Sequence, residues 1–166
     1  MQNAENPAKN SLEIIQTTDL IDFIPVLKEL EFGDTFKLAM LKWCGMGDRD
    51  RSIGFWQVYL AKLEAETIGV MGLYQLVDSP SEVVWVGWFG IRPKFRRQGW
   101  GRIIINQLKE YAREFEFQQL WVYTDNPNLA AISFYENCEF VKLGVAKDIC
   151  PGKTHSLSDI IMMFNL

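Results

Sequence analysis

The sequence contains a single histidine and has no excess of positive charge. His155 is the single histidine, and Cys44, Cys138 and Cys150 show no C-x-x-C spacing, so the sequence predicts no metal site. An odd cysteine count without paired spacing indicates a reducing compartment, and we expect a cytoplasmic protein. The net charge of -4 at pH 7 argues against a surface that neutralises duplex phosphates, so no nucleic-acid partner is expected.

Long apolar runs are also missing. The longest, residues 83–91, is far shorter than the roughly 20 residues that a membrane-spanning helix needs. The first ten residues, MQNAENPAKN, lack the apolar centre of a signal peptide. We therefore expect a frayed tail over 1–10, a single domain over 11–166 and no membrane contact.

The chain carries strand patterns and helix patterns in turn. Residues 82–91 are apolar at both parities, as in a central strand that is covered on both faces. The helical pattern at 103–115 and the strand pattern at 119–124 complete a β-loop-α-β crossover, which implies parallel pairing. The other predicted strands are 12–16, 55–63, 67–77, FVKLGVA (140–146) and DIIMMF (159–164), and the other predicted helices are 20–30, 35–43 and 128–138, the last capped by Asn126 or Asn128.

A basic segment stands out in this acidic chain. IRPKFRRQGWGRIII, residues 91–105, contains five Lys or Arg residues and no Asp or Glu. Arg96, Gly99 and Gly101 form the pattern R-x-x-G-x-G between the predicted central strand and the following helix. Glycine exposes main-chain amides, and a helix N-terminus stabilises an anion by about 0.3 to 1 kcal/mol. The sequence therefore predicts a phosphate-binding turn.

Two other phosphate-binding patterns compete with this one. The dinucleotide fingerprint G-x-G-x-x-G reads G-W-G-R-I-I here and lacks its third glycine, and Gln119 stands where an acidic residue is expected. This leaves a nucleotide-binding oxidoreductase as an alternative that meets only part of its pattern. A P-loop ending in G-K-T at 152–154 fails, because Lys147 occupies the position of its first glycine.

At these residues the sequence resembles the GNAT superfamily of N-acetyltransferases. FGIRPKFRRQGWGRII is similar to that family's strand, proline, arginine and glycine sequence, and NLAAISFYENCEF is similar to its N-x-x-A-x-x-x-Y-x-x-x-G-F segment. The resemblance spans residues 83–140 and is looser elsewhere. It implies an α/β (α+β) single domain with a mixed, mostly antiparallel central sheet of about seven strands, flanked by about four helices.

The resemblance also implies acetyl-CoA as the cofactor, an amine as the acceptor and a set of binding residues. Main-chain groups of Phe89 and Ile91 would hold the thioester oxygen and the pantetheine arm, residues 97–102 the pyrophosphate, and Asn128 the pantetheine side. Tyr135, in the second segment, would protonate the departing thiolate. The cofactor-binding set is Phe89, Ile91, Arg96, Arg97, Gln98, Gly99, Trp100, Gly101, Arg102 and Asn128.

A base is the hardest residue to find. Deprotonating an amine of pKa near 10.4 costs about 4.6 kcal/mol at pH 7, so a base or a proton relay is expected. Residues 83–91 contain no ionisable side chain, which makes Glu82, just before them, the candidate base, with His155 or a water relay as alternatives. The acceptor, a small-molecule or peptide amine, is expected to contact residues 32–43 and 147–158. The alternative function is a catalytically silent acyl-CoA sensor.

Three further expectations concern the backbone and the assembly. Gly87 or Gly90 is expected to mark a β-bulge that opens the central strand to the cofactor. Glu116 and Glu139 stand where the family usually has a glycine after a helix, so left-handed backbone there would cost on the order of 1 kcal/mol each. The apolar strand DIIMMF could pair across a homodimer as well as within one sheet.

Overall fold

The computed structural model describes residues 12–17, 19–30, 53–149 and 159–166. The predicted N-terminal tail, the predicted helix at 35–43 and the acceptor segment 32–43 lie outside the described residues. So do Cys44, Cys150, His155 and residues 150–158 of the second acceptor segment.

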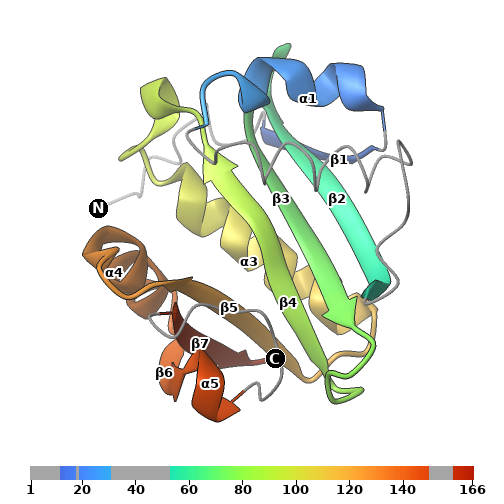
Figure 1. Cartoon of the computed structure of the whole chain (residues 1–166). Helices are drawn as coiled ribbons and strands as arrows, with labels where there is room; N and C mark the ends of the chain where they lie inside the picture. The colour runs from blue at the N-terminus through green and yellow to red at the C-terminus, as the bar shows by residue number, and fades with distance from the viewer. Residues whose placement is uncertain (1–11, 18, 31–52, 150–158) are drawn as a thin grey trace, which may run out of the picture.

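The described strands form one seven-stranded sheet in the order β1-β2-β3-β4-β5-β7-β6 (Figure 1). Every neighbouring pair is antiparallel except β4 and β5, which are parallel. The predicted mixed, mostly antiparallel sheet is confirmed. The strands are β1 (Leu12–Gln16), β2 (Ile53–Leu63), β3 (Glu66–Leu76), β4 (Val83–Ile91), β5 (Gln119–Asp125), β6 (Val141–Val145) and β7 (Asp159–Asn165).

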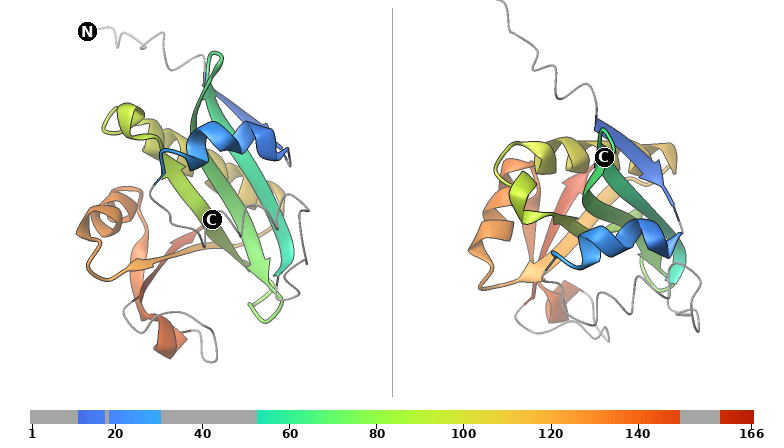
Figure 2. Two further views of the ribbon diagram at one scale, coloured as in Figure 1. Left: turned by 45° about the horizontal axis from the view of Figure 1, so that its top comes forward. Right: turned by 90° about the horizontal axis from the view of Figure 1, so that it is seen from above.

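Helices cover both faces of this sheet. The crossover from β4 to β5 passes through the 3-10 turn η2 (Pro93–Phe95) and the long helix α3 (Trp100–Glu114). Helix α1 (Leu20–Leu27) lies on the face opposite to α3 (Figure 2). Helices α4 (Leu129–Asn137) and α5 (Ala146–Ile149) accompany the C-terminal strands; α5 was not predicted, because its first residue reads as the end of an apolar strand. No helix in the described parts of the chain is long and apolar enough to cross a membrane.

Two apolar clusters sit on the two faces and meet at β4. On one face α3 packs Ile104 and Leu108 against the sheet, and on the other α1 packs Phe23 and Val26. Residues 83–86 of β4 are each at most 5% exposed, so both parities of this strand are buried, as predicted. Fully burying one such side chain contributes about 1.5 to 3 kcal/mol, which makes β4 a rigid support for whatever follows it.

The two glutamates that replace glycine do adopt left-handed backbone. Glu116 has φ 63° and Glu139 has φ 69°. Each follows a helix end that is closed by a pair of main-chain hydrogen bonds: the amides of Glu116 and Phe117 donate to Arg113 and Ala112 at 2.9 and 3.0 Å. The same pair recurs after α4, so the helix-ending motif forms despite the cost of a non-glycine residue.

Candidate active site

A β-bulge interrupts β4 near its carboxyl end. Gly87 pairs with Gly72 and Gly90 pairs with Val70, so two residues of β4 stand opposite one residue of β3. Trp88, inside the bulge, has φ 53°. The bulge sends Trp88 to the face covered by α1 and Phe89 to the face covered by α3. The predicted bulge is confirmed, and both glycines flank it.

Beyond the bulge the sheet opens. β4 and β5 are paired over three residues, 83–85 with 119–121, and no later pair forms between these two strands. Figure 1 shows the two strands starting side by side and then diverging. The edge of β4 that carries Phe89 and Ile91 therefore has no neighbouring strand on the β5 side among the described residues. Its main-chain groups on that side, apart from the Ile91 carbonyl that accepts from Arg96, are available to a ligand.

Residues 97–102, here called the amide turn, lead from η2 into α3. Within the described chain, none of the six main-chain amides from Arg97 to Arg102 has a hydrogen-bond acceptor; the first that does is Ile103, which donates to Gly99 at 3.4 Å. Arg97 and Gly99 have φ 62° and 90°, and these left-handed residues shape the turn. Six adjacent donors at the N-terminus of a 15-residue helix form a site suited to an anion.

The basic residues that precede the amide turn are used by the fold. Arg92 pairs with Glu29 and Glu66, and Lys94 also pairs with Glu66. These contacts lower the pKa of Glu29, mainly through Arg92, and that of Glu66, mainly through Lys94.

Arg96 is likewise turned back onto the protein, because its Nε donates to the carbonyl oxygen of Ile91 at 2.8 Å. Arg96, Arg97 and Arg102 form no ion pair within the described chain, and Arg97 and Arg102 also make no side-chain hydrogen bond there. Their charge is therefore available to a bound anion.

Helix α4 packs against the start of α3 and against the bulge. The side-chain oxygen of Asn128 accepts a hydrogen bond from the amide of Ala131 at 3.1 Å, so Asn128 is the N-cap. The rings of Phe134 and Phe89 are stacked, with centroids 5.5 Å apart. A Cβ on Gly101 would lie 3.0 Å from the Phe134 ring, so this glycine permits the close approach of α3 and α4.

Tyr135 lies in the same packing. Its side chain is 7% exposed, and its ring meets Phe140 edge to face at 5.5 Å. Its hydroxyl makes no hydrogen bond to any described residue. Burial raises the pKa of Tyr135 above that of an ordinary tyrosine, so the hydroxyl keeps its proton at neutral pH.

Lys109 is a functional candidate that the sequence reasoning missed. Its ammonium group is buried, donates to the carbonyl oxygen of Cys138 at 2.7 Å and lies 3.5 Å from the centroid of Phe164. Desolvation lowers the pKa of Lys109. The signal was its position on the apolar side of α3, between Leu108 and Ala112. Lys109 ties α3 to the end of the helix that carries Tyr135.

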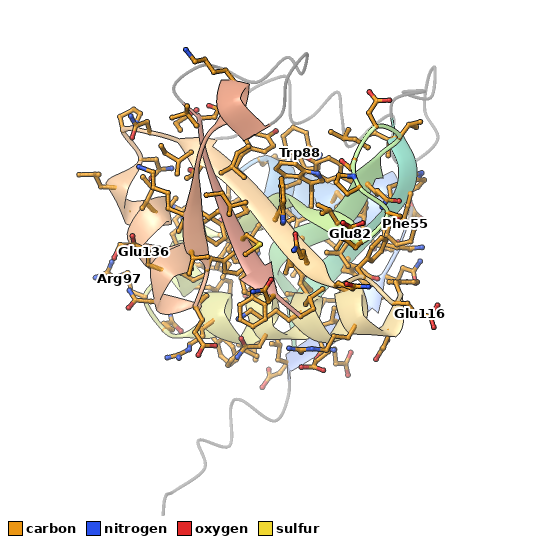
Figure 3. All side chains as sticks on the ribbon, turned by 90° about the horizontal axis from the view of Figure 1, so that it is seen from below. Phe55, Glu82, Trp88, Arg97, Glu116 and Glu136 are labelled. Carbon is orange, nitrogen blue, oxygen red and sulfur yellow. The ribbon has the colours of Figure 1, made fainter. Side chains whose placement is uncertain are left out.

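Glu82, the predicted base, is not brought to this site. Its carbonyl oxygen accepts the amides of Gln118 and Gln119, and its carboxylate meets Ser81. Seven residues separate it from Phe89, which at about 3.3 Å per residue puts the two about 23 Å apart along β4. Figure 3 shows Glu82 beside Phe55, on the opposite side of the molecule from Arg97. The predicted role of Glu82 has no geometric support.

Comparison with known proteins assigns the family. The description "Acetyltransferase (GNAT) family" matches residues 18–140, which include the bulge, the amide turn and Tyr135. The chain belongs to this family. Among curated proteins, no sequence matches the chain. No group of three or more His, Cys, Asp or Glu residues that could hold a metal ion occurs in the part of the GNAT domain that the structure describes.

Solved structures share the GNAT fold at low sequence identity. A GNAT family acetyltransferase from Elizabethkingia anophelis, with acetyl-CoA bound, is 20% identical over 95% of this chain and 99% of its own, with a TM-score of 0.68. A Bacillus subtilis acetyltransferase in complex with CoA is 15% identical over 93% and 99% of the two chains, with a TM-score of 0.69. An IAA acetyltransferase from Bacillus cereus is 15% identical over 94% and 100%, with a TM-score of 0.66. These similarities establish the fold.

Proposed function

We propose that this GNAT-family protein transfers an acetyl group from acetyl-CoA to a primary amine within a ternary complex. One observation carries the proposal: the six amides of the amide turn have no acceptor in the described chain, and they adjoin the open edge of β4. A diphosphate offers acceptor oxygens and negative charge, which match these donors, the helix N-terminus and the side chains of Arg97 and Arg102.

The residues around the turn suit the rest of the coenzyme. Acetyl-CoA supplies the thioester that is the acetyl donor. The bulge leaves the main-chain groups of Phe89 and the amide of Ile91 on an edge without a strand partner, where they can bind an extended, amide-containing arm much as a neighbouring strand would. Arg96 supports this edge by holding the Ile91 carbonyl, and the side-chain oxygen of Asn128 is committed to capping α4. Solved GNAT acetyltransferases with acetyl-CoA or CoA bound support the same assignment.

The transfer needs one proton removed and one delivered. As the amine nitrogen bonds to the acetyl carbon, the carbon–sulfur bond breaks, and we assign protonation of the thiolate to Tyr135. Its hydroxyl is protonated and makes no hydrogen bond to a described residue, so it can donate. Main-chain amides at the bulge would stabilise the negative charge that develops on the acetyl oxygen as the amine attacks. In acyl-transfer enzymes such a contact is worth about 2.7 to 4 kcal/mol. Because Glu82 is remote, we assign removal of the amine proton to a water relay.

A catalytically silent acyl-CoA sensor is the second candidate. What favours it is that β4 carries no ionisable side chain beside the proposed thioester position. A sensor would retain the amide turn and the open edge but would bind acetyl-CoA without turnover. The two functions therefore differ in thiol release and share coenzyme binding.

Thermal unfolding and thiol release test the proposal together. We expect excess acetyl-CoA to stabilise the folded protein by RT ln(1 + [L]/Kd), where [L] is the concentration of free acetyl-CoA, and so to raise the melting temperature. Gly99→Glu should abolish this shift. We expect at least one member of a panel of small-molecule and peptide amines to cause release of coenzyme A thiol. A stabilised protein that releases no thiol with any amine would favour the sensor, and an unchanged melting curve would overturn both. Cytoplasmic location and dimerisation stay predictions.

A further inference from the structure

Arg92 occupies the junction between β4 and η2, immediately before the segment that leads into the amide turn. We propose that Arg92 is a positioning residue that holds the amide turn in its binding geometry and links it to helix α1. The inference rests on the proposed function, because it takes the ligand of the amide turn to be coenzyme A.

The side chain of Arg92 connects three segments that are distant in sequence. Its Nη1 donates at 2.8 Å both to the carboxylate of Glu66 and to the carbonyl oxygen of Thr67, at the start of β3. Its Nη2 donates to the carboxylate of Glu29, in the turn that follows α1. The main-chain amide of Arg92 donates to Ile68 at 2.9 Å. The residue is therefore held through both its side chain and its backbone.

The next residues extend this attachment up to the amide turn. Lys94 pairs with Glu66, the same carboxylate that binds Arg92. The ring of Phe95 lies below both cations, 5.9 Å from the Arg92 guanidinium carbon and 5.0 Å from the Lys94 nitrogen. Arg96 donates to Ile91. Each residue from 92 to 96 thus has a fixed partner, and the free amides begin at the following residue. The direction of those amides is set by how this segment is attached.

Stability alone is a poor explanation for this arrangement. Arg92 is 9% exposed, and its buried Nε has no hydrogen-bond partner in the described chain. The side chains of Glu29 and Glu66 are 37% and 44% exposed, and ion pairs with exposed partners contribute little to stability. A planar guanidinium fixes three acceptors at defined angles, which a lysine cannot do. The charge of Arg92 therefore serves to fix the geometry of the amide turn.

The link to α1 gives the proposal a second consequence. Phe23 and Val26 of α1 pack on the sheet face opposite to α3, and Glu29 follows two residues after the helix. The ion pair between Arg92 and Glu29 thus joins the turn that follows α1 to the connection between β4 and α3. Occupation of the amide turn should restrain Arg92 and, through Glu29, the end of α1.

The test compares three variants with a matched control. Arg92→Met removes the guanidinium, Arg92→Lys keeps the charge without the fork, and Glu29→Gln removes only the charge of the carboxylate that links Arg92 to α1. Arg113→Gln is the control, because it breaks an exposed arginine–glutamate pair, with Glu110, elsewhere on α3. The readouts are the Kd for coenzyme A by calorimetry, KM and kcat for acetyl-CoA, the melting temperature, and hydrogen exchange of residues 20–30 with and without coenzyme A.

We expect Arg92→Met to raise the Kd for coenzyme A and the KM for acetyl-CoA by about tenfold, with kcat at saturation changed less than about twofold. Arg92→Lys should recover part of the loss, and Arg113→Gln should match the wild type. Glu29→Gln should abolish the protection of residues 20–30 that coenzyme A gives the wild type.

Each contrary outcome has a distinct meaning. A wild-type protein that fails to bind coenzyme A overturns the proposed function. Wild-type binding with an unchanged Kd in folded Arg92→Met, even at a lowered melting temperature, shows a purely structural role and overturns the inference. Where Arg92→Met fails to fold, Glu29→Gln decides, because it leaves the guanidinium and its other acceptors in place; unchanged protection of residues 20–30 in that variant also overturns the inference.

Discussion

The amide turn and the surroundings of Tyr135 lie on neighbouring elements and use opposite kinds of chemistry. The amide turn offers six main-chain donors without described acceptors, and its side chains point largely to solvent. Tyr135 offers one hydroxyl, on a ring that packs against Phe134, Phe140 and the core of the α3 face. One region is polar and formed by backbone, and the other is apolar and depends on a single atom.

This difference determines which substitutions matter. A main-chain site tolerates exchange of side chains, because every residue supplies the same amide, but it fails when the backbone geometry changes. A side-chain site tolerates volume-conserving changes of the neighbouring apolar residues. It is more sensitive to a small shift of the backbone that carries the side chain. Substitutions in the two regions should therefore separate binding from catalysis.

The largest effect is expected for Tyr135→Phe. Loss of a positioned general acid typically lowers the rate by about 10²- to 10⁴-fold, and here it removes one oxygen from a site whose ring packing is kept. We expect kcat to fall by that factor while the Kd for coenzyme A stays within about twofold of the wild type. Stopped-flow thiol release and calorimetry measure the two quantities. Unchanged turnover with an active amine would remove Tyr135 from the mechanism.

A smaller effect, confined to binding, is expected for Gly99→Ala. Gly99 has φ 90°, and a side chain in left-handed backbone costs roughly 1 to 2 kcal/mol. The free variant can relieve this strain by rearranging the turn, and coenzyme A must then restore the binding geometry, which corresponds to about a 5- to 30-fold weaker affinity. Gly54→Ala is the matched control, because a Cβ there would meet only Val77, at an ordinary 3.7 Å. If both variants bind coenzyme A equally well, the shape of the turn does not determine binding.

A still smaller effect is expected for Arg102→Gln. The side chain of Arg102 is exposed and forms no described ion pair, so its contribution to anion binding is that of a surface charge, about 0.3 to 1 kcal/mol. We expect coenzyme A to bind about two- to fivefold more weakly at low salt, with the difference fading as ionic strength rises. Calorimetry at two salt concentrations tests this, and a salt-independent loss would indicate a direct structural role.

The sequence predicted what depends on local chemistry. Runs of apolar and β-forming residues identified the seven described strands, the residue types at 87 and 90 located the bulge, and the two glycines at 99 and 101 marked the turn. Each of these features is decided by a few adjacent residues, which is why the sequence alone was sufficient. At Glu116 and Glu139 the sequence instead cast doubt on the helix-ending turns, and both residues adopt the left-handed backbone all the same.

What the sequence missed depends on contacts between distant residues. Five basic residues between 92 and 102 were interpreted as one anion site, whereas Arg92 and Lys94 bind carboxylates contributed by residues 29 and 66. Lys109 was not singled out from the sequence, because its contacts with Cys138 and Phe164 form only when α3 packs against the C-terminal strands. Glu82 was chosen because it was the nearest ionisable residue in sequence, and a strand places such a residue at the far end.

The two regions also differ in pH dependence, with no effect expected near neutral pH and a loss of stability only above about pH 10. Burial raises the pKa of Tyr135 and raises that of Tyr59, in the same α3-face cluster, to about 12. A tyrosine whose folded-state pKa exceeds the unfolded value of about 10 stabilises the fold fully below pH 10, and this contribution is lost as the pH rises through the folded pKa. From pH 7 to about 9 neither thiolate protonation by Tyr135 nor stability should change on account of these groups.

Above about pH 10 the free energy of unfolding should fall by up to about 1.4 kcal/mol per pH unit for each buried tyrosine. Urea unfolding of the wild type and Tyr135→Phe at a series of pH values isolates the contribution of Tyr135, because the variant lacks its ionisable group and should lose stability less steeply. Equal slopes in the two proteins would mean that the hydroxyl of Tyr135 is already open to water in the folded state. The amide turn has no such titration, so a break in catalysis near neutral pH would have to come from removal of the amine proton.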